Sequence, residues 1–134
     1  MLDISVTQAQ GRVPVTVMHL KGDFDTVGCE VFDARSQEVI AAGATDVLLD
    51  LTAVPFMSSA GLRAMHRLFY QLHPEGSEEH KRILNEGVRQ GIYKAPHMKL
   101  LNPAPRVLEM LKLVGVDMYM DILTGNEAKA LKSF

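Results

Sequence analysis

The segment that most constrains the fold is 46–72, where a short apolar run leads through a polar turn into a helical repeat. Residues 46–51 contain a short apolar run and are bounded by polar and turn residues, as a buried strand of a parallel sheet would be. Farther along, apolar side chains recur at helical spacing at Leu62, Met65, Phe69 and Leu72. This pattern predicts a strand and a helix packed on a sheet, with the connecting loop beyond the carboxyl end of the strand.

The rest of the chain continues the alternation of strands and helices. Strands are expected at 3–8 and 13–21, and their short connection makes them an antiparallel hairpin. The other expected elements are a helix over 26–42 ended by Gly43, a helix over 59–73, a strand over 97–102, a helix face from Val107 to Gly115, a strand over 118–123, and a terminal helix opened by a capping box of Thr124 and Glu127. Together they predict an α/β fold: a mixed sheet of about five strands with about four helices, in which parallel strand–helix–strand units follow the hairpin.

Two hydroxyls, Ser58 and Ser59, stand where the helix over 59–73 begins. Either could cap the helix by accepting a hydrogen bond from a free backbone N–H, or could accept a phosphate where the helix dipole favours negative charge. Capping is the simpler interpretation of the serines alone. Asp23, Asp25 and Asp50 also fall at expected strand ends, so they are predicted to share one surface with the serines. Asp23 and Asp25 could equally end a strand and cap a helix.

The string Pro-Phe-Met-Ser-Ser-Ala-Gly-Leu at 55–62, preceded by Asp-Leu-Thr at 50–52, resembles the signature of the STAS domain, the sulfate transporter and anti-sigma factor antagonist family. Residues 22–25 and 99–107 resemble two further segments of that family, so the similarity extends over nearly the whole chain. It implies a single STAS-like domain over 1–134, with an insertion at about 74–96. The insertion could be a solvated loop or an element that selects one partner.

In bacterial anti-sigma factor antagonists of this family, the serine that matches Ser59 is phosphorylated by a partner kinase. The resemblance therefore implies a partner-switching regulator that binds an anti-sigma factor or serine kinase when unphosphorylated and releases it when Ser59 is phosphorylated, with Ser58 as the alternative acceptor. Ser58 replaces an aspartate of the best-known members, and Ala60 replaces a second hydroxyl. The residues expected to bind the partner are Asp23, Asp25, Asp50, Met57, Ser58, Ala60 and Gly61.

A second function stays open at this point. The chain could be a STAS scaffold that is not phosphorylated, or a module that binds a small anion or a nucleotide in a signalling or transport assembly. Modification of a serine by a kinase would separate these alternatives from partner switching.

Composition argues against several other classes. With 14 basic and 16 acidic residues the net charge is −2, too weak a field to favour nucleic acid or a membrane surface as partner. The single cysteine, Cys29, excludes a disulfide framework, and the five histidines show no ligand spacing, so no metal or other cofactor is expected. No serine has a histidine and an acid at a recognised spacing, so no enzymatic activity is expected. We expect a cytoplasmic monomer or weak homodimer.

Overall fold

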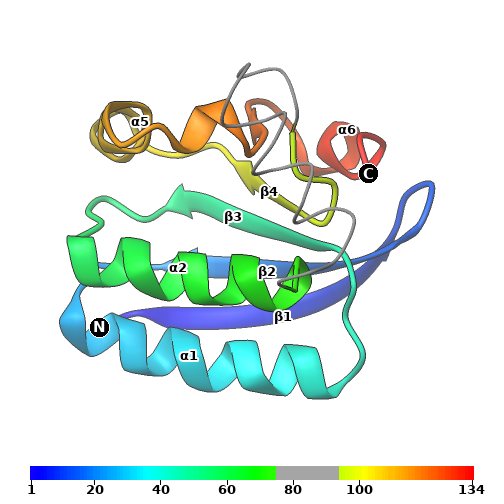
Figure 1. Ribbon diagram of the computed structural model, residues 1–134, viewed down its shortest axis with the longest axis horizontal. Helices are drawn as coiled ribbons and strands as arrows, with labels where there is room; N and C mark the ends of the chain where they lie inside the picture. The colour runs from blue at the N-terminus through cyan, green and yellow to red at the C-terminus, as the bar shows by residue number, and fades with distance from the viewer. Residues whose placement is uncertain (75–93) are drawn as a thin grey trace.

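The computed structural model describes residues 1–74 and 94–134, and in these ranges five strands form one sheet with helices packed against it (Figure 1). The strands are β1 Asp3–Gln10, β2 Pro14–Lys21, β3 Val47–Ala53, β4 Met98–Leu101 and β5 Ile122–Leu123. The helices of the same ranges are α1 Thr26–Ala41, α2 Ser59–Leu72, α5 Pro105–Leu113 and α6 Glu127–Leu131, with a 3₁₀ turn η2 at Val116–Met118.

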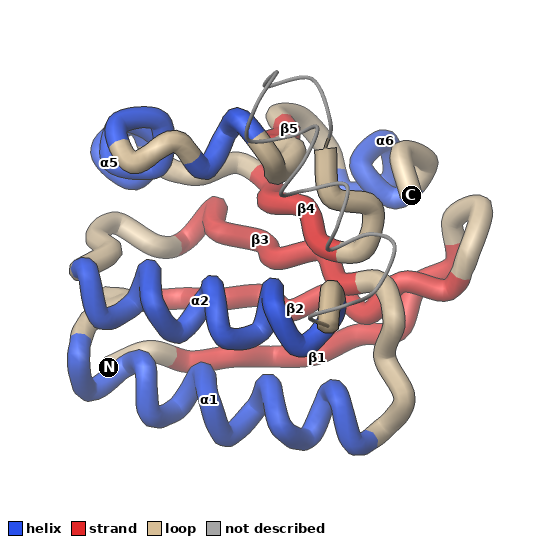
Figure 2. Tube along the Cα trace, in the orientation of Figure 1, coloured by secondary structure: helices blue, strands red, loops and turns tan. Residues whose placement is uncertain are grey.

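The strand order in the sheet is β1-β2-β3-β4-β5. β1 pairs with β2 antiparallel, and every later pair is parallel. This confirms the predicted mixed sheet, with an N-terminal hairpin followed by parallel strand–helix–strand units. Figure 2 shows α1 and α2 side by side along one side of β1, β2 and β3.

The two faces of the sheet bury different apolar clusters because side chains alternate along each strand. The larger cluster includes Val47, Leu49 and Leu51 of β3 together with residues of α1, α2 and α5. The smaller cluster lies on the other face, where Leu48 packs with Val15 and Val17 of β2 and with Ala130 and Leu131 of α6. Asp50 lies two residues after Leu48 on the same strand, so its side chain is on the same face of the sheet, the one that carries α6.

The end of α1 confirms the predicted stop at Gly43. The glycine has φ +91°, and its N–H donates to Ile40 O at 3.0 Å, while the next N–H, of Ala44, donates to Val39 O at 3.2 Å. This pair of bonds satisfies carbonyls that the end of a helix leaves free, and the left-handed backbone favours glycine.

Near the C-terminus two predictions are wrong in detail. The expected strand over 118–123 is reduced to β5, because residues 116–118 form η2 after Gly115 turns the chain with φ +82°. The expected capping box is absent: Asn126 caps α6 by accepting a hydrogen bond from Lys129 N at 2.8 Å. Glu127 is thus the first residue of α6, and its carboxylate reaches the sheet. Most of the expected insertion, residues 75–93, lies outside the described residues.

Candidate functional site

The loop that follows β2 runs alongside the loop that follows β3. Three backbone hydrogen bonds join them, from Gly22 N–H to Ala53 O (3.0 Å), from Phe24 N–H to Phe56 O (2.9 Å) and from Ser58 N–H to Phe24 O (3.0 Å). The carboxyl ends of two neighbouring parallel strands therefore bring the start of α1 next to the start of α2. This is the edge of an α/β sheet at which sites commonly form.

Ser58 is the N-cap of α2. Its backbone is extended, with φ −88° and ψ 173°, and its Oγ accepts a hydrogen bond from Gly61 N at 3.2 Å. The same hydroxyl donates to Phe24 O at 3.4 Å. The half-buried hydroxyl of Ser58 thus accepts one hydrogen bond and donates another, so the capping interpretation applies to this serine.

Ser59 is the first residue of α2, and its side chain is exposed. The hydroxyl makes no hydrogen bond to any residue within 1–74 or 94–134. The first turn of α2 holds no acidic residue, so the positive end of the helix dipole is not neutralised there by a carboxylate of its own turn. The two serines thus differ: Ser58 caps the helix, whereas Ser59 is exposed and its hydroxyl bonds to no described residue.

Two of the expected partner-binding residues lie beneath the surface. Met57 is 6% exposed, and Gly61 is buried against the loop that follows β2. A Cβ on Gly61 would lie 2.3 Å from Phe24 O and 2.9 Å from the Phe24 ring. Met57 and Gly61 therefore position Ser59, while Ala60, beside it, is half-buried.

The acidic residues do not all lie together. Asp23 is exposed on the loop beside Ser58, and Asp25 caps α1 by accepting a hydrogen bond from Gly28 N at 2.9 Å. The prediction that Asp50 shares this surface is wrong. β3 continues past Asp50 to Ala53, and the alternation of the strand turns Asp50 away from α2, where its Oδ2 lies 3.0 Å from His19 Nδ1.

The family model of the STAS domain matches residues 6–78, which is more than half of the chain. The chain belongs to the STAS domain family. No curated protein sequence matches it.

Solved structures share the fold of this STAS domain. An anti-sigma factor antagonist from Mycobacterium paratuberculosis aligns with a TM-score of 0.73 at 18% identity, covering 99% of this chain and 93% of the other. The anti-sigma factor antagonist SpoIIAA in its unphosphorylated form aligns at 0.63 and 17% identity, covering 96% and 94%. The Bacillus cell fate determinant SpoIIAA in the phosphorylated form aligns at 0.64 and 18% identity, covering 96% of each chain. At these identities the likeness shows the fold.

Two exposed apolar residues lie on one of the joined loops and on the helix that the other leads into. Phe56, on the loop before α2 and three residues from Ser59, is 48% exposed, and Val27, in the first turn of α1, is 56% exposed. The sequence carries no signal for either exposure, because an apolar side chain beside a strand or at the start of a helix is ordinarily assigned to the core.

Among the described helices, none combines the length and the apolar character that a membrane span needs.

Replacement of Ser58 with alanine is expected to lower the free energy of unfolding of this STAS domain by about 1 kcal/mol, because Gly61 N loses its capping acceptor. Ser58→Asp keeps an acceptor and should lose less. Ser59→Ala is the matched control and should leave stability unchanged, since its hydroxyl bonds to no described residue. Urea denaturation measures all three variants, and equal losses for Ser58→Ala and Ser59→Ala would contradict the assignment of the cap.

Proposed function

We propose that this STAS domain is a partner-switching regulator whose unphosphorylated form binds an anti-sigma factor with serine kinase activity. Phosphorylation of Ser59 by that partner ends the binding, and the factor that the partner restrains is then bound again. In this cycle the domain is a cytoplasmic binding module and a kinase substrate, and it catalyses no step itself. The single observation that carries the proposal is the exposed hydroxyl of Ser59 at the start of α2, which bonds to no residue of the described ranges.

The surroundings of Ser59 suit a surface that meets another protein. Phe56 offers exposed apolar area on the loop before α2, and Asp23, on the loop joined to it, offers a carboxylate for a basic group of the partner. Such a combination of an apolar anchor with a charged rim is typical of protein interfaces. Asp23 would also oppose a phosphate added nearby, because like charges repel.

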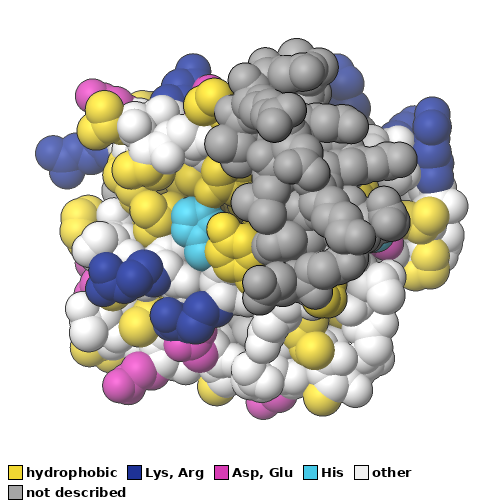
Figure 3. Space-filling view, viewed as in Figure 1, with side chains coloured by type: hydrophobic (Ala, Val, Ile, Leu, Met, Phe, Trp, Pro, Cys, Tyr) yellow, Lys and Arg dark blue, Asp and Glu magenta, His cyan; other side chains and the backbone are white. Residues whose placement is uncertain are grey.

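A phosphate at Ser59 can be tolerated by this domain alone. It adds about −1.5 to −2 charges, which the positive end of α2 favours. Arg63 lies one turn farther along α2, is exposed, and forms no ion pair within the described residues, so its guanidinium is available to the phosphate. Figure 3 shows basic side chains gathered on the face over α2.

The structural relatives support a switch without refolding. SpoIIAA is known in an unphosphorylated and in a phosphorylated form, and the two align with this chain about equally well, at TM-scores of 0.63 and 0.64. Under the proposal, the phosphate acts by its charge at the contact surface and requires no rearrangement of the sheet.

The experiment that tests the proposal is to incubate the protein with ATP and serine kinases of the anti-sigma class and to locate the phosphate by mass spectrometry. We expect a single phosphate on Ser59, with none on the Ser59→Ala variant. Modification of Ser58 would move the acceptor by one residue and contradict its assignment as a structural cap. Absence of phosphate on both serines would favour the scaffold or the small-anion module.

A further inference from the structure

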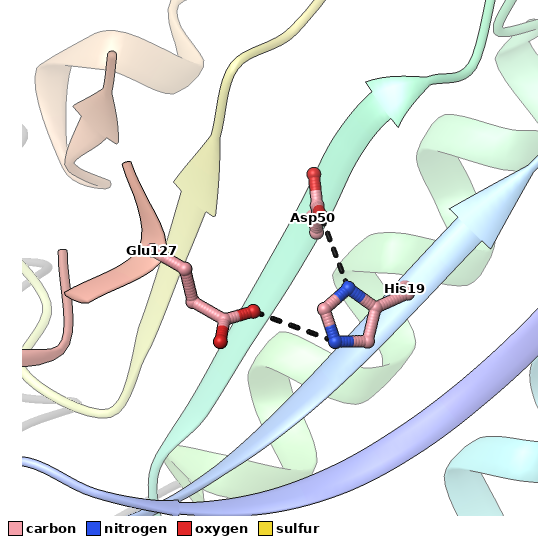
Figure 4. Close-up of side chains that lie close together, drawn as sticks. All are labelled: His19, Asp50 and Glu127. Carbon is pink, nitrogen blue, oxygen red and sulfur yellow. Dashed lines mark hydrogen bonds and ion pairs between the residues drawn. The ribbon is translucent and has the colours of Figure 1, made fainter. Parts of the chain in front are cut away.

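His19 lies between two carboxylates on the face of the sheet that carries α6 (Figure 4). Its Nδ1 is 3.0 Å from Asp50 Oδ2, and its Nε2 is 3.4 Å from Glu127 Oε1. The three residues come from β2, β3 and α6, and each offers a ligand atom within 4.8 Å of the other two. Figure 4 shows both carboxylates directed at the imidazole ring.

Asp50 is held in a fixed orientation on one side of the ring. Its Oδ1 accepts hydrogen bonds from Thr52 N at 3.0 Å and from Thr52 Oγ1 at 2.6 Å. Burial acts to raise the pKa of Asp50, but the hydrogen bonds from Thr52 and His19 outweigh it and lower the pKa below its usual value. An ionised carboxylate only accepts hydrogen bonds, so Asp50 accepts from the N–H of His19 Nδ1, and in a neutral imidazole the lone pair is then on Nε2.

His19 Nε2 faces two oxygen atoms on the other side of the ring. Glu127 Oε1 is 3.4 Å away, and Thr7 Oγ1, from β1, is within hydrogen-bond distance at 3.2 Å. A neutral imidazole nitrogen and a carboxylate oxygen are both acceptors, so a cation between them is favourable. Two ligands bound to a tetrahedral ion at about 2.0–2.2 Å lie roughly 3.4 Å apart, which matches the separation of Nε2 and Oε1.

We infer that His19 Nε2 and the Glu127 carboxylate bind a divalent transition-metal ion of the zinc class, with Asp50 as the residue that orients the imidazole. The hydroxyl of Thr7 and water complete the coordination. The side chains of His19 and Glu127 are 32% and 39% exposed, so an ion in solution can reach them. The ion joins the start of α6 to β2, on the opposite face of the sheet from α2, so the inference does not rest on the function proposed for Ser59.

The test is a calorimetric titration of the full chain with Zn²⁺ after treatment with a chelator. We expect one site, at least tenfold weaker in Glu127→Gln and in His19→Gln, and about tenfold weaker in Asp50→Asn, because an orienting carboxylate contributes on the order of 10-fold to 100-fold in affinity. His97→Gln is the matched control: His97 Nδ1 pairs with Asp46 Oδ1 at 2.9 Å, but in the described ranges no third ligand residue joins this pair. It should bind Zn²⁺ as the wild type does.

Circular dichroism and thermal unfolding with and without Zn²⁺ give a second readout. Because the ion binds the folded chain, Zn²⁺ should raise the melting temperature of the wild type and of His97→Gln, but not of Glu127→Gln. Glu127 lies at the start of a short surface helix, so this variant tests the site even if His19→Gln misfolds. Absence of Zn²⁺ binding by the wild type, or binding that Glu127→Gln leaves unchanged, would overturn the inference.

Discussion

Under the proposed function, phosphorylation of Ser59 is expected to weaken binding of the STAS domain to an anti-sigma partner on the order of a hundredfold, or about 3 kcal/mol. The reason is electrostatic: a doubly charged group appears on a contact surface that presented only a hydroxyl, and like-charge opposition in an interface costs several kcal/mol. Ser59→Asp carries one charge on a shorter side chain and should reproduce part of the loss, about tenfold. Calorimetry or surface plasmon resonance with the purified partner measures both.

Two variants control this experiment. Ser59→Ala should bind the partner as the wild type does, because the exposed hydroxyl bonds to no described residue. It should no longer be released by kinase and ATP, because the oxygen that accepts the phosphate is missing. Ser5→Asp makes the same chemical change on β1, where Ser5 is exposed and pairs with His19 on the sheet face away from α2. It should not affect partner binding. Equal affinities for Ser59→Ala and Ser59→Asp would refute the switch.

Local patterns in the chain predicted most of the fold, because each element carries its own signals. The apolar run of β3, the helical repeat of α2 and the glycine after α1 are readable from neighbours in sequence. The C-terminal segment was predicted less well. Thr124 and Glu127 have the spacing of a capping box, but Asn126 caps α6, and the Glu127 carboxylate lies 3.4 Å from His19 Nε2 on β2. His19 and Glu127 are 108 positions apart in the sequence, so no local pattern indicates that contact.

The candidate site was predictable in part for the same reason. The junction at Ser58 and Ser59 follows from one strand and one helix, but the division of roles between the two serines depends on Phe24, which reaches Ser58 from the neighbouring loop. Asp50 was grouped with the serines because the predicted strand ended at Leu51, which placed Asp50 at its carboxyl end. β3 continues to Ala53, so Asp50 lies inside the strand, and the alternation of side chains fixes its face. The cluster of His19, Asp50 and Glu127 has no sequence spacing that could have indicated it.

Gly61→Ala is expected to lower the free energy of unfolding by about 3 kcal/mol, although alanine is the better helix former by about 1 kcal/mol. The added Cβ would lie 2.3 Å from Phe24 O. This backbone oxygen is fixed in place, because Ser58 N–H donates to it and the N–H of the same residue, Phe24, donates to Phe56 O. Relief of the clash requires the start of α2 to move away from the loop that follows β2. Urea denaturation measures the loss.

Gly43→Ala separates this clash from ordinary glycine effects. Among the described residues, no atom lies within 4 Å of a Cβ built on Gly43, so it is the left-handed backbone, φ +91°, that opposes alanine, at about 1–2 kcal/mol. A loss for Gly61→Ala no larger than that for Gly43→Ala would mean that the two loops are not packed this closely. If the clash is real, Gly61→Ala should also slow phosphorylation of Ser59, because the same movement displaces the helix end that presents its hydroxyl, whereas Gly43→Ala, at the far end of α1, should leave the phosphorylation rate unchanged.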